Sequence, residues 1–73
     1  MMRYARLENS RRLQRVAALL RDGRPRTTLE IIQGARVCAV NSIAAELRAN
    51  GLNVQCRRDG DLWWYWLEGG HAD

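Results

Sequence analysis

The chain has 73 residues, of which 47% are apolar and 27% are charged, so we expect one small domain, because a chain this short buries only about 60% of its unfolded surface. No apolar run approaches the roughly 18 residues of a membrane span, and the N-terminus lacks the apolar stretch of a secretory signal. We therefore expect a cytoplasmic protein without a membrane partner, too small for an enzyme's pocket, with no catalytic residue, cofactor or small-molecule substrate.

The charge is unevenly distributed along the chain. All twelve basic residues are arginine. Residues 1–36 carry nine arginines against three acids, and residues 37–73 carry three against five, which gives net charges of +6 and −2. A basic half on a small chain is typical of a polyanion binder, since arginines that neutralise phosphates release condensed counterions. The alternative is that these arginines are simply the solvated faces of helices.

Metal and redox chemistry find little support in the sequence. Cys38 and Cys56 are eighteen residues apart, and the single histidine is His71. This is not a metal-ligand spacing, so no metal site is predicted. In a reducing cytoplasm we expect both thiols to be small buried or half-buried side chains, with a regulatory disulfide as the alternative.

The first predicted helix follows an arm over residues 1–9. Ser10 is a candidate N-cap, and Gly23 with Pro25 ends the helix, because glycine tolerates the left-handed conformation and proline prevents helix resumption. Its apolar residues repeat at i, i+3, i+4 and i+7: Leu13, Val16, Ala17 and Leu20.

A second, short helix is predicted from a capping signal. An extended connector over residues 24–27 leads to the sequence Thr-Thr-Leu-Glu at 27–30, a capping box formed by Thr27 and Glu30. Gly34 limits this helix to about two turns. The expected inward pair is Leu29 and Ile32.

Residues 37–50, closed by Gly51, predict a third helix. Its inward face would carry Val37, Val40, Ile43, Ala44 and Leu47. The opposite face has small side chains: Cys38, Ser42, Ala45 and Ala49. Asn41 and Arg48 lie together on one flank.

After residue 52 the apolar period changes to two, which predicts a β-hairpin with a turn at 58–61 and a second strand at 62–67. In one parity Trp63, Tyr65 and Leu67 face the core with Leu52, Val54 and Cys56; the other parity exposes Trp63 and Tyr65. Residues 69–73 would be a flexible tail.

In the first parity one side of the second strand is exposed, and it would serve as the interface of a homodimer or as a contact surface for another partner. This surface consists of Leu62, Trp64 and Trp66. The alternative is that the tryptophans pack on the arm, against Tyr4 and Leu7, in a monomer.

Three helices followed by a two-stranded β-hairpin wing predict an α+β fold, the winged helix-turn-helix, over residues 10–68. The motifs at 27–30, 46–51 and 65–67 resemble those of the small winged helix proteins of bacteriophages and prophages. Members of that family are presumed DNA binders. The resemblance therefore implies a partner, double-stranded DNA, and a role as a transcriptional regulator or excision-type architectural factor.

In a helix-turn-helix the later helix enters the major groove. Arg36, at the mouth of the third helix, would then contact guanine or a phosphate, while Asn41 reads adenine and Ser42 either base. Thr28 and the amides beside it would hold a phosphate. The full predicted DNA-binding set is Arg26, Thr28, Arg36, Asn41, Ser42, Arg48, Arg57 and Arg58.

A protein-interaction adaptor on the same scaffold is the second hypothesis. The apolar outer face of the hairpin and the small-residue face of the third helix, which permits close packing, both favour it.

Overall fold

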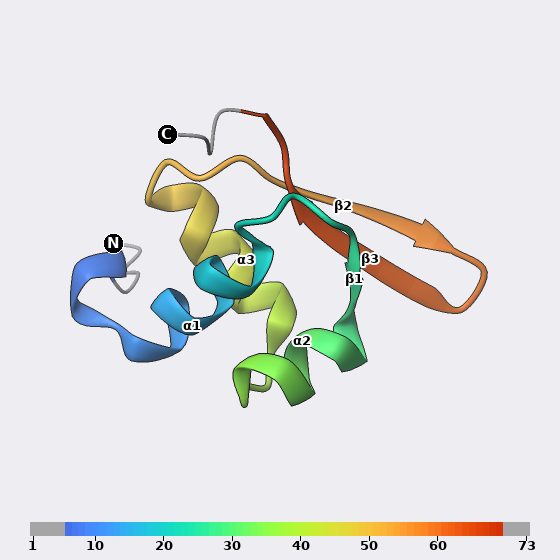
Figure 1. Ribbon diagram of the computed structural model, residues 1–73, viewed down its shortest axis with the longest axis horizontal. Helices are drawn as coiled ribbons and strands as arrows, with labels where there is room; N and C mark the ends of the chain where they lie inside the picture. Colours follow the sequence, from blue (N-terminus) through green and yellow to red (C-terminus); the bar gives the residue numbers. More distant parts are fainter. Residues whose placement is uncertain (1–5, 70–73) are drawn as a thin grey trace.

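Within residues 6–69, the part of the chain that the computed structural model describes, three α-helices pack against one face of a three-stranded antiparallel sheet (Figure 1). This is an α+β arrangement. The elements in order are η1 (Leu7–Asn9), α1 (Arg11–Leu20), β1 (Arg26–Thr27), α2 (Thr28–Ala35), α3 (Val40–Ala49), β2 (Val54–Asp59) and β3 (Leu62–Leu67). No helix in this part of the chain has both the length and the hydropathy to cross a bilayer.

Helix α1 forms as predicted. The hydroxyl of Ser10 accepts a hydrogen bond from the backbone amide of Leu13 at 3.3 Å, which satisfies one of the free amides at the helix start. The helix ends at Leu20, and Gly23 follows with a φ of 77°. The four predicted inward residues are all buried: Leu13, Val16, Ala17 and Leu20.

Helix α2 begins with the predicted capping box. Thr27 Oγ1 accepts from the Glu30 amide at 3.1 Å, and Glu30 Oε1 accepts from the Thr27 amide at 2.9 Å. Of the predicted inward pair, Ile32 is half-buried and packs against the core, but Leu29 is 59% exposed; the fully buried residues are Ile31 and Ala35. The cap fixes the rotation of the helix, and that rotation turns the latter two residues, one turn apart, toward the core.

The end of α2 also differs from the prediction. Gly34 lies inside the helix, where a Cβ would come within 3.2 Å of Leu19, so its role is to let α1 and α2 approach closely. The helix ends at Arg36, which has a left-handed φ of 56°. Arg15 Nε donates to the Ala35 carbonyl oxygen at 2.8 Å and so satisfies one of the free carbonyls at this end.

Helix α3 starts three residues later than predicted. Its N-cap, Ala39, has a left-handed φ of 53°, and residues 37–39 belong to the turn from α2. Cys38 is therefore not on the helix. Val37 matches the helical spacing of the inward face, but it lies in the turn and is half-buried there. The other predicted inward residues are buried: Val40, Ile43, Ala44 and Leu47.

The sheet has one strand more than the predicted hairpin. Strand β1 pairs with β3, so the strand order is β1-β3-β2. The cross-strand pairs place Thr27 beside Trp64 and Cys56 beside Tyr65. A two-residue strand has no periodic signal, which is why the sequence indicated only an extended connector here.

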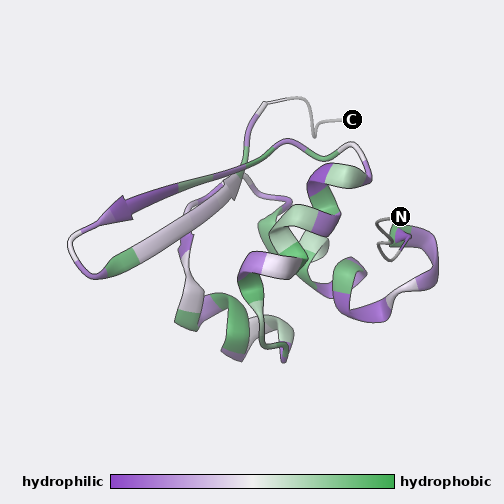
Figure 2. Cartoon of the chain, turned by 180° about the vertical axis from the view of Figure 1, so that it is seen from behind, coloured by the Kyte–Doolittle hydropathy of each residue, from purple (hydrophilic) through white to green (hydrophobic). Residues whose placement is uncertain are grey.

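Strand β3 has the first of the two predicted parities. Tyr65 and Leu67 are buried together with Val54 of β2. Trp63, expected in the core, is 45% exposed, and Cys56 is also exposed. Both lie on the helix side of the sheet, but the far part of the hairpin projects past the helices (Figure 1), so both remain exposed. Strand β2 is correspondingly hydrophilic over most of its length (Figure 2).

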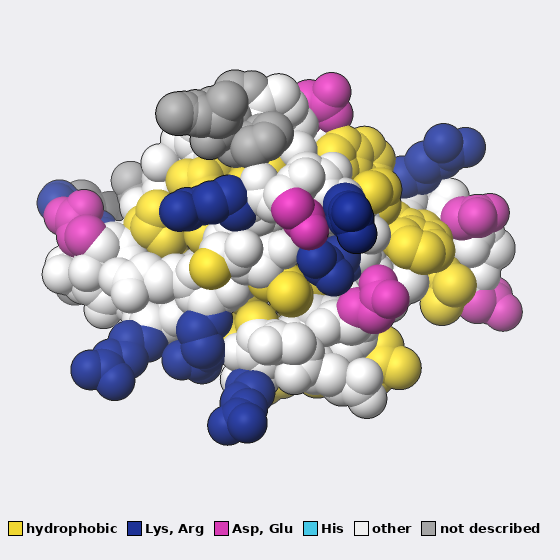
Figure 3. All heavy atoms as spheres, in the orientation of Figure 1, with side chains coloured by type: hydrophobic (Ala, Val, Ile, Leu, Met, Phe, Trp, Pro, Cys, Tyr) yellow, Lys and Arg dark blue, Asp and Glu magenta, His cyan; other side chains and the backbone are white. Residues whose placement is uncertain are grey.

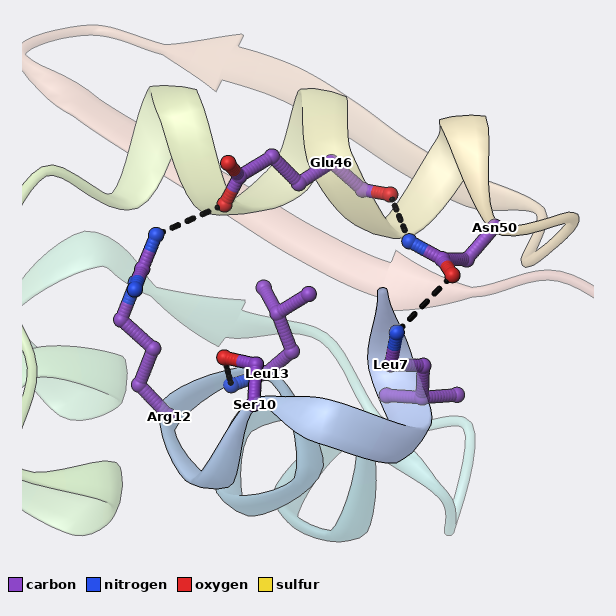
Figure 4. Close-up of polar contacts among 6 residues, drawn as sticks. All are labelled: Leu7, Ser10, Arg12, Leu13, Glu46 and Asn50. Atoms are coloured by element: carbon purple, nitrogen blue, oxygen red, sulfur yellow. Dashed lines mark hydrogen bonds and ion pairs between the residues drawn. The ribbon is translucent and has the colours of Figure 1, made fainter. Parts of the chain in front are cut away.

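Residues 7–9, expected to belong to an arm, form η1, which is held against α1 and α3 (Figure 4). The Leu7 amide donates to Asn50 Oδ1 at 2.9 Å, and beside it Arg12 of α1 pairs with Glu46 of α3 at 3.0 Å. Leu7 packs on the helical core rather than on the tryptophans. Tyr4 and His71, the other named residues of the predicted arm and tail, lie outside the described residues.

Candidate nucleic-acid interface

A groove of about 400 Å³ runs between α3 and the hairpin. It combines residues from four elements, and the start of α2 closes one end. The lining residues are Thr28, Asn41, Ala44, Arg48, Cys56, Trp63 and Tyr65. Three of the predicted DNA-binding residues, Thr28, Asn41 and Arg48, therefore come together in one place.

Asn41 and Arg48 share the predicted flank of α3, two turns apart, and this flank faces the sheet. The Tyr65 hydroxyl donates to Asn41 Oδ1 at 3.2 Å. Arg48 Nε donates to the Val54 carbonyl oxygen at 2.8 Å, and its Nη2 lies 3.7 Å from the Cys56 sulfur. These contacts tie α3 to the first and third residues of β2 and to β3.

The outward side of α3 is uncovered by the described chain. Ser42, Ala45 and Ala49 are all exposed there, in agreement with the predicted small-residue face. Arg36, expected at the mouth of this helix, instead ends α2 and is separated from α3 by residues 37–39, because the turn intervenes. Its side chain is exposed.

Arg26 is turned away from the groove toward the end of α1. Its Nη2 pairs with Asp22 Oδ2 at 2.8 Å, and its Nε donates to the Leu19 carbonyl oxygen at 3.2 Å. The hydrogen bond from the Arg24 backbone amide, followed by the charge of Arg26, lowers the pKa of Asp22 below its usual value. The arginine thus holds the connector in place.

Arg57 and Arg58, predicted together as wing contacts, lie on opposite faces of the sheet, because side chains alternate along a strand. Arg58 pairs with Trp63 and shares its groove side, and its Nε donates to the Gly60 carbonyl oxygen at 2.9 Å. Arg57 pairs with Trp64 on the outer face.

The outer face of the sheet carries the three residues predicted as a partner surface. Leu62 is 51% exposed, whereas Trp64 and Trp66 are half-buried. A shallow hollow on this face is lined by Pro25, Arg57, Asp59, Trp64 and Trp66. The chain therefore covers the two tryptophans in part. The most exposed apolar side chains of the hairpin, Leu62 and Trp63, lie beside its turn on opposite faces.

Charge is not gathered into one patch on the face seen in Figure 3. Arginine side chains stand apart around the helical part, and hydrophobic side chains gather over the hairpin with acidic ones beside them. Asp59 and Asp61 are exposed next to the hairpin turn.

Both thiols, expected to be buried or half-buried, are free and exposed. The turn before α3 carries Cys38, and the uncovered part of the hairpin carries Cys56, so neither reaches the core. Among residues 6–69, no three His, Cys, Asp or Glu side chains come together in a way that would hold a metal ion.

Four of the groove-lining residues were not among the predicted site residues: Ala44, Cys56, Trp63, and Tyr65 as the partner of Asn41. The strand alternation placed Tyr65 on the helix side in only one of the two parities, and no local signal pairs it with a residue 24 positions away. Comparisons with family models, with curated proteins and with solved structures found no significant match.

Proposed function

We propose that the chain is a DNA-binding domain of the winged helix-turn-helix type, a transcriptional regulator or excision-type architectural factor of a phage or prophage. The observation that carries the proposal is the uncovered side of α3, which follows α2 after a four-residue turn at 36–39 and is flanked by the hairpin groove. Two helices joined by a turn of this length are typical of DNA-binding helix-turn-helix motifs.

Affinity in this proposal comes mainly from phosphates. The small side chains of Ala45 and Ala49 let α3 approach the floor of the major groove, but they offer no hydrogen bonds to bases. Base reading then rests on Asn41 and Ser42, and each good contact contributes about 1–3 kcal/mol of discrimination. The exposed guanidinium of Arg36 and the N-terminus of α2 at Thr28 would contact the DNA backbone.

The proposal predicts weak, salt-dependent binding to duplex DNA. In a fluorescence anisotropy titration with a fragment pool, we expect affinity to fall at least about ten-fold between roughly 50 and 200 mM salt, because even two displaced phosphate counterions produce that slope. Absence of binding at the lower concentration would contradict the proposal.

A protein-interaction adaptor is the second candidate. It is favoured by the exposed Leu62 and Trp63, which lie beside acidic residues at the hairpin turn. An adaptor would show little DNA binding and a shallow salt dependence.

We further propose that the outer hairpin face pairs two copies of the chain, which would bring two weakly reading α3 helices to one duplex. Sedimentation equilibrium should then show a dimer, and Leu62→Ser should raise its dissociation constant at least about ten-fold, since two buried leucine side chains are lost. Trp63→Ser, an equally accessible site on the opposite face, is the control. A wild type that remains at 8.4 kDa at high micromolar concentration would exclude the dimer.

A further inference from the structure

The hydrogen bond between Tyr65 and Asn41 joins the buried face of the sheet to the exposed surface of α3. Tyr65 is only 5% exposed, so packing fixes the direction of its hydroxyl, which donates to Asn41 Oδ1 at 3.2 Å. Asn41 is the second residue of α3 and is exposed at the edge of the groove. The carbonyl end of its amide therefore points to the sheet, and the NH₂ end is left for a ligand.

This orientation matters for the bases that Asn41 would contact. A side-chain amide reads adenine by a two-way contact, in which its oxygen accepts from the N6 amino group and its nitrogen donates to N7. The Asn41 oxygen could accept a second hydrogen bond, but the bond from the buried Tyr65 hydroxyl turns this oxygen toward the sheet, so it is not presented to a base edge together with the nitrogen. A residue that presents its NH₂ group alone suits a base edge made of acceptors, and guanine presents two in the major groove, N7 and O6.

We infer that Tyr65 is a positioning residue that makes Asn41 a hydrogen-bond donor to the bases, so that the domain prefers guanine over adenine at the position Asn41 contacts. The inference rests on the proposed function, since it requires α3 in the major groove. It replaces the adenine contact expected from the sequence, because the sequence does not show which end of the amide is occupied. Arg48, on the same flank, makes its contacts elsewhere: its Nε donates to the Val54 carbonyl oxygen, and its Nη2 lies 3.7 Å from the Cys56 sulfur.

The test compares base preferences of the wild type, Asn41→Ala and Tyr65→Phe in a selection from randomised duplexes, followed by anisotropy titrations. The base pair at which Asn41→Ala loses discrimination marks the contacted position. There the wild type should favour guanine over adenine by about three- to five-fold, the effect expected of one neutral hydrogen bond. Tyr65→Phe frees the amide oxygen, so the preference should disappear or turn to adenine.

A purely structural role of Tyr65 would weaken all sites alike and leave the ratio of guanine to adenine unchanged. That outcome overturns the inference while the proposed function stands. A wild type that prefers adenine at this position also overturns the inference, and this result does not depend on the folding of any tyrosine variant. Gln33→Ala, at an exposed position of α2 outside the groove lining, should keep the wild-type ratio. Absence of binding by every protein, wild type included, overturns the proposed function and the inference with it.

Discussion

Replacement of Ala45 by glutamate is expected to weaken duplex binding at least about thirty-fold, because like charges brought together at an interface cost several kcal/mol. Ala45 lies on the uncovered side of α3, where a longer, negatively charged side chain would meet the DNA phosphates. Glutamate is a good helix former and the site is exposed, so the melting temperature should stay nearly unchanged. Anisotropy titration measures the loss of affinity for the duplex, and thermal denaturation followed by circular dichroism measures the melting temperature.

Ala18→Glu is the matched control for this variant. Ala18 is an exposed alanine in the interior of α1, so the substitution has the same change in charge and nearly the same helix propensity. We expect it to weaken binding no more than about three-fold through the overall charge. Equal losses of duplex affinity in the two variants would show that α3 has no specific role in DNA binding.

The second large effect concerns the core. Ile31→Ala should lower the free energy of unfolding by about 3 kcal/mol, because it leaves a cavity among α1, α2 and α3 where the side chain is fully buried. Leu29→Ala, two residues earlier in the same helix, should cost less than about 1 kcal/mol, since Leu29 is largely exposed. Urea denaturation of both variants measures the difference, and a larger cost at Leu29 would mean that α2 is rotated toward the phase predicted from the sequence.

Local signals in the sequence were sufficient for most of the elements. The cap at Ser10, the capping box at Thr27 and Glu30 and the alternation that marks the two hairpin strands all depend on residues within a few positions of one another, although the alternation left open which parity buries Tyr65. Such patterns determine where an element starts and which face is apolar. They predicted the three helices and the hairpin in their correct order.

The turn between α2 and α3 could not be predicted in the same way. Arg36 and Ala39 adopt left-handed conformations that residues with a Cβ rarely take, and neither residue type marks such a position. Without a glycine there, the helical spacing of Val37 extended the predicted third helix too far. This error placed Arg36 at the wrong end of the turn and Cys38 on a helix.

The contacts of individual arginines could not be predicted from the sequence either. Arg26 pairs with Asp22, Arg15 covers the end of α2, and Arg48 joins α3 to β2. The partner of Arg15 is 20 residues away and depends on the packing of α1 against α2, whereas Asp22 lies four residues before Arg26, and neither pairing was predicted. The sequence could therefore predict a basic half but not which of its charges are left for DNA.

The most direct measurement of the central proposal is a titration of ¹⁵N-labelled protein with a duplex, followed by amide chemical shifts. We expect the largest shifts on the outward side of α3, at Ser42, Ala45 and Ala49, and at Thr28, while Ala18 on α1 changes little. Shifts confined to the outer hairpin face around Trp64 and Trp66, or no shifts at all with duplex in excess, would contradict it.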